Sequence, residues 1–85
     1  MYKVELNKSV RKFLKSHPDI WKKFFYALKK ITVNPFNNLL DIKKLIWSKN
    51  HYRLRIWKYR FLYEVRENEI IVYFYKADSR WNIYK

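Results

Sequence analysis

The strongest constraint on the fold is a repeated alternation in the second half of the chain. Apolar and polar side chains alternate along residues 52–56, 59–66 and 69–77, and only two residues separate each segment from the next. Alternation with period two is typical of strands that bury one face, and such short connections join antiparallel neighbours. We therefore predict an antiparallel meander of three strands.

Helical spacing dominates the first half, after an alternating segment at residues 2–6 that we interpret as a further strand. Asn7 is a candidate N-cap for an amphipathic helix that runs to about Ser16. Pro18, followed by an acidic residue, predicts the start of a second helix, which should end before Asn34 and Pro35. The two helices are expected to form a hairpin.

Residues 36–50 show no clear period, and we predict a loop there with one short strand or turn around residues 45–47. The predicted order is strand, two helices and a run of strands. This order indicates the α+β class, with the helices packed on one face of an antiparallel sheet. A length of 85 residues leaves room for one domain, residues 1–85.

Three arginines should share the face of the meander that is turned away from the helices. Side chains alternate across a strand, so Arg53 and Arg55 lie opposite their apolar neighbours, and Arg60 takes the same side of the next strand. A two-residue turn at Trp57-Lys58 would set Arg55 directly opposite Arg60. Like charges in that position are destabilising, which suggests that the arginines bind an anion.

The same counting through Glu67-Asn68 places Tyr75 opposite Arg60 and Tyr73 opposite Leu62. Clustered arginines beside aromatic rings suit phosphates and unpaired bases. We therefore predict an RNA-binding surface, whose candidate residues are Arg53, Arg55, Tyr73, Tyr75 and the exposed Trp57 of the hairpin turn. The alternative is an ordinary solvated strand face.

The charge balance favours a polyanionic partner. Twenty Lys and Arg against seven Asp and Glu give a net charge of +13, which indicates nucleic acid or an acidic protein, with a membrane surface as a weaker alternative. The chain has no cysteine, no glycine and two histidines, which argues against disulfides, phosphate-binding glycine loops and a zinc site. We expect a cytoplasmic protein without metal or cofactor, since no apolar run is long enough for a membrane span or a signal peptide.

The second half also resembles the RelE/ParE superfamily of type II toxins. The matching stretches are LDxKKL at residues 40–45, YRLRI at 52–56 and YRFLYEV at 59–65, followed by a hydrophobic strand and a late Arg and Tyr. The resemblance implies a RelE-like fold and a toxin that an acidic antitoxin wraps. For the RelE branch it implies an endoribonuclease that cuts messenger RNA in the ribosomal A site without a metal.

The resemblance assigns five catalytic residues, which are Arg53, Arg55, Arg60, Arg80 and Tyr84. Attack of a ribose 2′-hydroxyl on the adjacent phosphate needs a base, cations for the developing charge and an acid for the leaving oxygen. Arg60 would supply the cation, and Arg53 and Arg55 would hold phosphate and ribosomal RNA. Arg80 would stabilise the phosphate or the leaving group, and Tyr84 would stack or donate a proton.

The chain departs from the family pattern at three places. Lysines usually stand where Arg53 and Arg55 do, and arginine is a poor proton acceptor, so the general base stays open. His51 has the right parity and pKa range for that role, although an exposed His at a strand start is the commoner reading. Trp57-Lys58 replaces the usual turn glycine. Asp78-Ser79 replaces the glycine before the late arginine, and for Asp78 we favour a structural, turn-forming role.

Two rival functions are left open. A ParE-like protein with this fold would inhibit gyrase by binding, without nuclease activity, and a toxin relic would bind antitoxin but cut nothing. Arg60, Arg80 and Tyr84 together favour the nuclease.

Overall fold

The computed structural model describes residues 1–36, 39–46 and 48–79. Within them the chain forms, in order, β1 (Lys3–Leu6), α1 (Lys8–Ser16), a 3₁₀ turn (Pro18–Ile20), α2 (Trp21–Val33), β2 (Ile42–Lys44), β3 (His51–Ile56), β4 (Tyr59–Arg66) and β5 (Ile71–Asp78). This order confirms the predicted succession of strand, two helices and strands.

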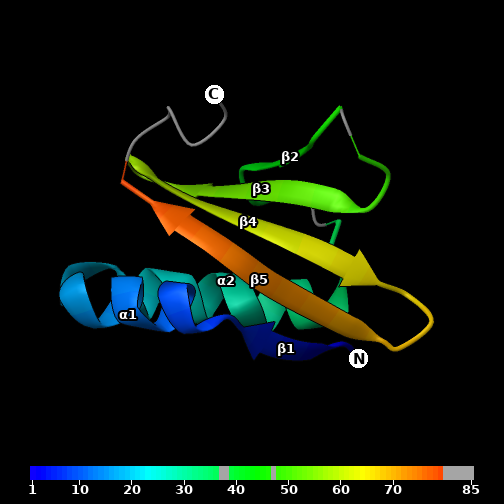
Figure 1. Cartoon of the computed structure of the whole chain (residues 1–85), viewed down its shortest axis with the longest axis horizontal. Helices are drawn as coiled ribbons and strands as arrows, with labels where there is room; N and C mark the ends of the chain where they lie inside the picture. Colours follow the sequence, from blue (N-terminus) through cyan, green and yellow to red (C-terminus); the bar gives the residue numbers. More distant parts are fainter. Residues whose placement is uncertain (37–38, 47, 80–85) are drawn as a thin grey trace.

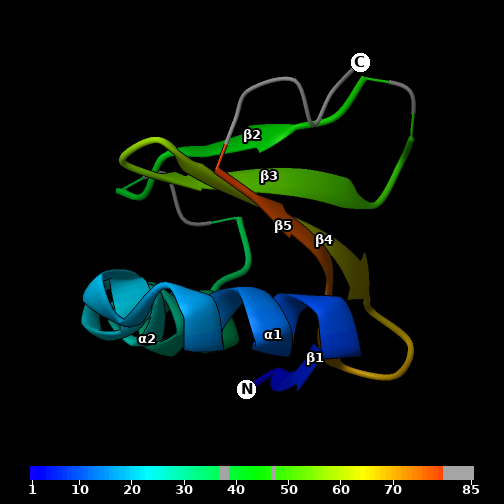
Figure 2. The same ribbon diagram turned by 60° about the vertical axis from the view of Figure 1, so that its left-hand side comes forward.

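The strands form one sheet in the order β1-β5-β4-β3-β2. β1 runs parallel to β5, and the other neighbouring pairs are antiparallel. In Figures 1 and 2 the two helices lie side by side beneath the sheet, with β1 and β2 at its opposite edges. The predicted α+β class is confirmed, and the sheet is mixed because the first strand joins it in parallel.

The helix boundaries follow from local chemistry. The side-chain oxygen of Asn7 accepts a hydrogen bond of 2.7 Å from the backbone N–H of Ser9, which confirms Asn7 as the N-cap of α1. The prediction that the second helix starts at Pro18 was partly wrong. Residues 18–20 form a 3₁₀ turn and α2 begins at Trp21, because the tighter i→i+3 turn reverses the chain in three residues.

The core lies between the helices and one face of the sheet. Its fully buried helix residues include Val10, Leu14, Phe24 and Ile31, and the strands contribute Leu54, Phe61, Tyr63, Val65, Val72 and Phe74. Tyr63 is buried with its hydroxyl donating to the backbone carbonyl of Pro35 at 2.7 Å, which satisfies the polar end of the ring. Because these strand residues face the core, their neighbours in β3 and β4 face away from the helices.

The short strand lies three residues earlier than predicted. β2 covers Ile42–Lys44, and Ile42 pairs with Leu54 of β3. Leu45, placed in the strand or turn by the prediction, packs instead on Leu62 and Tyr75 across the opposite face of the sheet. That contact buries Leu45 and Leu62 outside the main core, so part of the face predicted to be open is covered.

The predicted pairing between β4 and β5 was wrong. Their connection has four residues, 67–70, and Ile70 has a φ of 56°, so Arg66 pairs with Ile71. The register also shifts between Leu62 and Tyr63. Arg60 therefore faces Asp78 and Leu62 faces Lys76, in place of the predicted tyrosines. A two-residue turn and an unbroken ladder were the assumptions that failed.

Within the described residues, no helix has both the length and the apolar character needed to cross a lipid bilayer.

Candidate nucleic-acid interface

The arginine cluster, which we define as Arg53, Arg55 and Arg60, lies on the sheet face turned away from the helices. β3 and β4 pair without interruption, and Arg55 stands directly opposite Arg60. Leu54, between the two β3 arginines, is buried in the core with Phe61. The predicted register of this hairpin is confirmed, and it sets Arg55 and Arg60 side by side with Arg53 two residues away on the same face.

Asp41 brings a carboxylate to the two β3 arginines of the cluster, while Asp78 stands opposite Arg60 on β5. Oδ1 of Asp41 lies 2.6 Å from Nη2 of Arg53, and its Oδ2 lies 3.9 Å from Nε of Arg55. The backbone carbonyl of Asp41 also accepts a hydrogen bond from the backbone N–H of Arg55 at 2.9 Å. The side chain of Arg53 is only 13% exposed, whereas that of Asp41 is 52% exposed, so the carboxylate holds Arg53 from the solvent side.

The hairpin turn supplies further acceptors for the other two arginines. Nε of Arg55 donates to the carbonyl of Trp57 at 2.9 Å, and Nη1 of Arg60 donates to the carbonyl of Lys58 at 3.4 Å. The pKa of Arg60 lies below its usual value, because burial and then repulsion from Arg55 and Arg53 disfavour its charge. Three guanidinium groups are thus concentrated at the β3–β4 turn.

Trp57 is the first residue of that turn and adopts a φ of 57°, a region that non-glycine residues rarely occupy. Trp57 is 55% exposed, in agreement with the prediction, and Nζ of Lys23 lies 4.7 Å from the centre of its ring. A large aromatic ring therefore stands beside the arginine cluster in a backbone position that glycine would fill with less strain.

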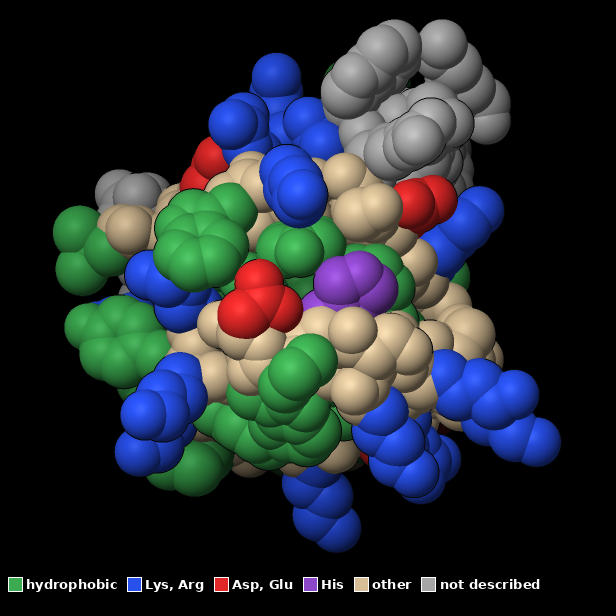
Figure 3. Space-filling view, turned by 90° about the vertical axis from the view of Figure 1, so that its left-hand side faces the viewer, with side chains coloured by type: hydrophobic (Ala, Val, Ile, Leu, Met, Phe, Trp, Pro, Cys, Tyr) green, Lys and Arg blue, Asp and Glu red, His purple; other side chains and the backbone are tan. Residues whose placement is uncertain are grey.

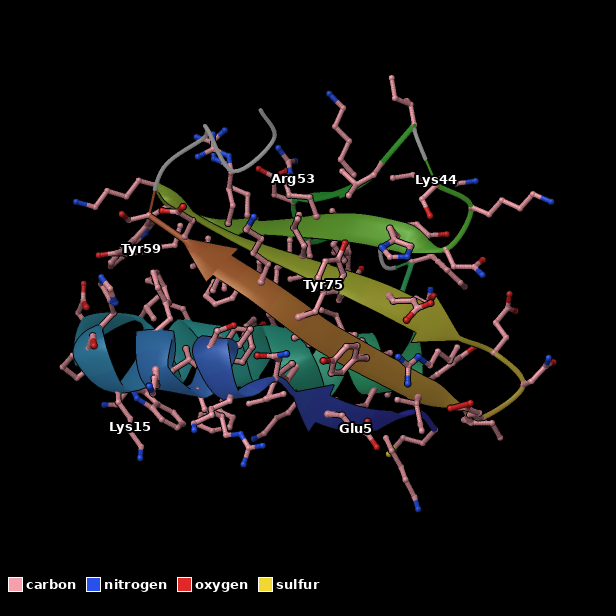
Figure 4. The ribbon with its side chains drawn as sticks, in the orientation of Figure 1. Glu5, Lys15, Lys44, Arg53, Tyr59 and Tyr75 are labelled. Carbon is pink, nitrogen blue, oxygen red and sulfur yellow. The ribbon has the colours of Figure 1, made fainter. Side chains whose placement is uncertain are left out.

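Tyr73 and Tyr75 lie at the other end of the same face. Their rings stack with centroids 6.2 Å apart, and the Tyr75 hydroxyl lies 2.7 Å from Nδ1 of His51. Nε2 of His51 is 3.8 Å from a carboxylate oxygen of Glu64. Figure 4 shows Tyr75 over β4 and β5, with Arg53 nearer the β2 edge of the sheet. Burial and the nearby Glu64 raise the pKa of Tyr75.

The predicted RNA-binding residues therefore form two groups. His51 and Arg55 are four steps apart along β3, about 13 Å at the usual rise of a strand, and Arg53 lies midway between them. Leu62, buried by Leu45 and Tyr75, lies between the groups. The hairpin brings Arg53, Arg55, Arg60 and Trp57 together, whereas Tyr73, Tyr75 and His51 make a separate network.

Two of the predicted catalytic residues, Arg80 and Tyr84, lie outside the described residues. Asp78 lies within them, and its Oδ1 accepts a hydrogen bond of 2.6 Å from the backbone N–H of Ser79. That short-range bond agrees with the turn-forming role expected for Asp78.

Sequence reasoning missed Asp41 as a site residue. The signal was available, since Asp41 is the single acid in the LDxKKL stretch and precedes a segment that could pair with β3. The prediction placed the short strand at residues 45–47, and with that placement Asp41 has no neighbour on β3. The observed pairing of Ile42 with Leu54 sets Asp41 beside Arg55. Across the described ranges, no three His, Cys, Asp or Glu side chains group as metal ligands.

Fold and site define a small α+β protein with a cationic sheet face, and comparisons place it among known proteins. No model of a known protein family matches the chain. It is 36% identical to the protein named "Putative toxin RelE1" of Methanocaldococcus jannaschii, over 99% of this chain and 96% of that one.

Two solved structures are also similar. The archaeal RelE-RelB complex of Pyrococcus horikoshii has a chain with a TM-score of 0.82 and 26% identity, covering 94% of this chain and 96% of that one. The RelB-RelE antitoxin-toxin complex of Methanococcus jannaschii gives a TM-score of 0.76 and 30% identity over 94% of each chain. The chain belongs to the RelE toxin family, as its resemblance implied.

Proposed function

We propose that this protein is the toxin of a type II toxin-antitoxin system, and that it cuts messenger RNA on the ribosome without a metal ion. The reaction is attack of a ribose 2′-hydroxyl on the adjacent phosphate, which breaks the bond to the 5′-oxygen of the next nucleotide. The observation that carries the proposal is the arginine cluster, three guanidinium groups on one sheet face beside the hairpin turn.

Arg60 is the candidate for stabilising charge on the phosphate as the new bond forms. It pairs with Arg55 across the hairpin, and its depressed pKa reflects burial and crowding by cations that a phosphate would relieve. Arg53 and Arg55 would bind neighbouring phosphates, since guanidinium groups bind phosphate oxygens in pairs of hydrogen bonds. Arg80 and Tyr84 keep their proposed roles at the leaving group, as predictions from the family resemblance.

Asp41 is our candidate for the general base that the sequence left open. A carboxylate can accept the 2′-hydroxyl proton, and Asp41 is half exposed while it contacts Arg53. His51 is a poorer candidate, because its two ring nitrogens already lie against the Tyr75 hydroxyl and the Glu64 carboxylate. In the free protein the Asp41 carboxylate occupies the side of Arg53 that a phosphate would approach.

The proposed partner is an acidic antitoxin. The net charge of +13 favours a polyanionic protein, and the similar chains from Pyrococcus horikoshii and Methanococcus jannaschii come from complexes named for a toxin and its antitoxin. Such a partner would lower the net charge and compete with RNA for the arginine cluster.

The test is incubation of the purified protein with ribosomes carrying a defined messenger RNA, and separately with gyrase and supercoiled DNA. Cleavage at the A-site codon without an effect on gyrase supports the proposal. Gyrase inhibition without cleavage would support the ParE-like function. The absence of cleavage, of gyrase inhibition and of growth arrest on induction would indicate a relic.

A further inference from the structure

A groove lies between α2 and the β3–β4 turn, next to the arginine cluster. We call it the hairpin groove, and its lining includes Lys23, Tyr26, Ala27, Asp41, Arg55 and Trp57. Its volume of about 420 Å³ falls in the usual range for small-ligand pockets, about 300–1,000 Å³. Asp41 and Arg55 belong to both the groove and the candidate site, so a chain bound at the cluster could continue into the groove.

The groove combines cations with the partly exposed ring of Trp57, over which Nζ of Lys23 lies at 4.7 Å. Lys22, Lys23 and Arg55 contribute positive charge, and Leu54 and Ala27 form part of an apolar floor. Figure 3 faces the end of the molecule that carries the hairpin turn, where Lys and Arg side chains surround exposed hydrophobic ones. A flat apolar ring attached to a negative charge, as in a nucleotide, complements this combination.

The backbone of Trp57 gives an independent reason to expect a ligand. A φ of 57° is unfavourable for a bulky side chain, and nothing in the hairpin pairing requires a ring at this turn position. Strained residues persist where the surrounding structure or a function maintains them. Here the strained residue is Trp57, which is 55% exposed and lines a cationic groove.

We propose that the hairpin groove binds one nucleotide of single-stranded RNA, with its base stacked on Trp57 and its phosphate held by Lys23 and Arg55. The inference rests on the proposed function, because it places this nucleotide beside the phosphate at the arginine cluster. RNA is favoured over a peptide because the groove continues the cluster through Arg55 and because stacking on an exposed ring needs no sheet edge or helix face.

The experiment measures the affinity of a labelled single-stranded hexanucleotide whose 2′-oxygens are methylated, which removes the attacking hydroxyl and prevents cleavage. Trp57→Gly should weaken binding about tenfold, and Trp57→Phe should retain most of the affinity. Because glycine suits a positive φ, Trp57→Gly should also keep or raise the melting temperature, so that misfolding does not explain the loss.

Ile70→Gly is the matched control. Ile70 has a φ of 56° and is 51% exposed, but it lies in the β4–β5 turn away from the groove. This variant should gain stability without any change in RNA affinity. Polyglutamate, a polyanion without bases, should bind Trp57→Gly and wild type equally.

Unchanged RNA affinity in Trp57→Gly would overturn the inference, as would an equal loss of polyglutamate binding, which would indicate a protein partner. The proposed function fails separately. If wild type leaves ribosome-bound messenger RNA intact while Trp57→Gly still weakens RNA binding, the inference of a nucleotide site is supported and the proposed nuclease activity is refuted. If wild type cuts and Trp57→Gly binds normally, the groove inference alone is lost.

Discussion

Asp41 offsets part of the positive charge of the arginine cluster in the free protein. Its carboxylate contacts Arg53 and lies near Arg55, so a phosphate that binds these arginines must compete with it. The pair is half open to solvent on the Asp41 side, which is 52% exposed, so a phosphate could approach Arg53 by displacing the carboxylate. In the proposed nuclease, Asp41 would therefore have two roles, as a competitor of the phosphate and as the proton acceptor.

Asp41→Asn separates these two roles. Removing the charge should tighten binding of methylated RNA by about threefold to tenfold, since two arginines lose a competing anion. If Asp41 is the base, cleavage of unmethylated messenger RNA on ribosomes should nevertheless fall at least about 100-fold. Asp19→Asn, in the turn between the helices, is the control for loss of one acidic charge. Tighter binding with undiminished cleavage would remove Asp41 as the base.

At the scale of elements, the β3–β4 hairpin was predictable and its neighbours were not. Alternation along Tyr59–Arg66 and a two-residue turn were enough to give the correct pairing of Arg55 with Arg60. The pairing of β5 with β4 depends on a four-residue connection and on a register shift beside Leu62. Neither feature changes the alternation of apolar and polar residues, so the sequence pattern could not predict them. The short strand β2 was predicted too late in the chain because the prediction counted Leu45 as a strand residue. Leu45 is apolar because it packs on Leu62 and Tyr75, on the sheet face away from the helices.

The burial of Tyr63 makes a prediction about alkaline stability. Burial raises the pKa of Tyr63 well above its usual value, so the unfolded chain loses this proton first. The stabilising contribution is therefore present below about pH 10, the ordinary tyrosine pKa, and declines as the pH rises beyond it.

Tyr63→Phe should accordingly lower the free energy of unfolding by about 1–3 kcal/mol at neutral pH, because the Pro35 carbonyl loses its buried donor. It should also flatten the decline in stability between about pH 9 and pH 11.5. Urea unfolding at several pH values measures both effects, and Tyr26→Phe, at an exposed tyrosine, is the control. An equally steep decline in Tyr63→Phe would contradict this account.

At the scale of the whole molecule, the helices cover one face of the sheet and the arginine cluster lies on the other. The net charge of +13 attracts any polyanion over long range, but only the side chains that contact phosphates release counterions on binding. The salt dependence of affinity therefore distinguishes direct contacts at the arginine cluster from general attraction.

Replacing Arg53, Arg55 and Arg60 together by glutamine should reduce the slope of log affinity against log salt concentration by about 2, at about 0.7 for each phosphate contact with a single strand. Replacing Lys8, Lys12 and Lys15 of α1 removes the same charge from a helix and should change the slope little. The measurement uses methylated RNA between about 50 mM and 200 mM salt. Equal changes in both variants would mean that only net charge matters.

The most direct test of the proposed nuclease is the rate at which the protein cuts messenger RNA in the A site of programmed ribosomes. Arg60→Ala should slow cleavage at least about 100-fold, as expected when a group that stabilises transition-state charge is removed, and Arg60→Lys should restore part of the rate. Arg11→Ala, at an exposed arginine of α1, should cut like wild type. Folded Arg60→Ala protein that cuts at the wild-type rate would show that the arginine cluster is not the site of the chemistry.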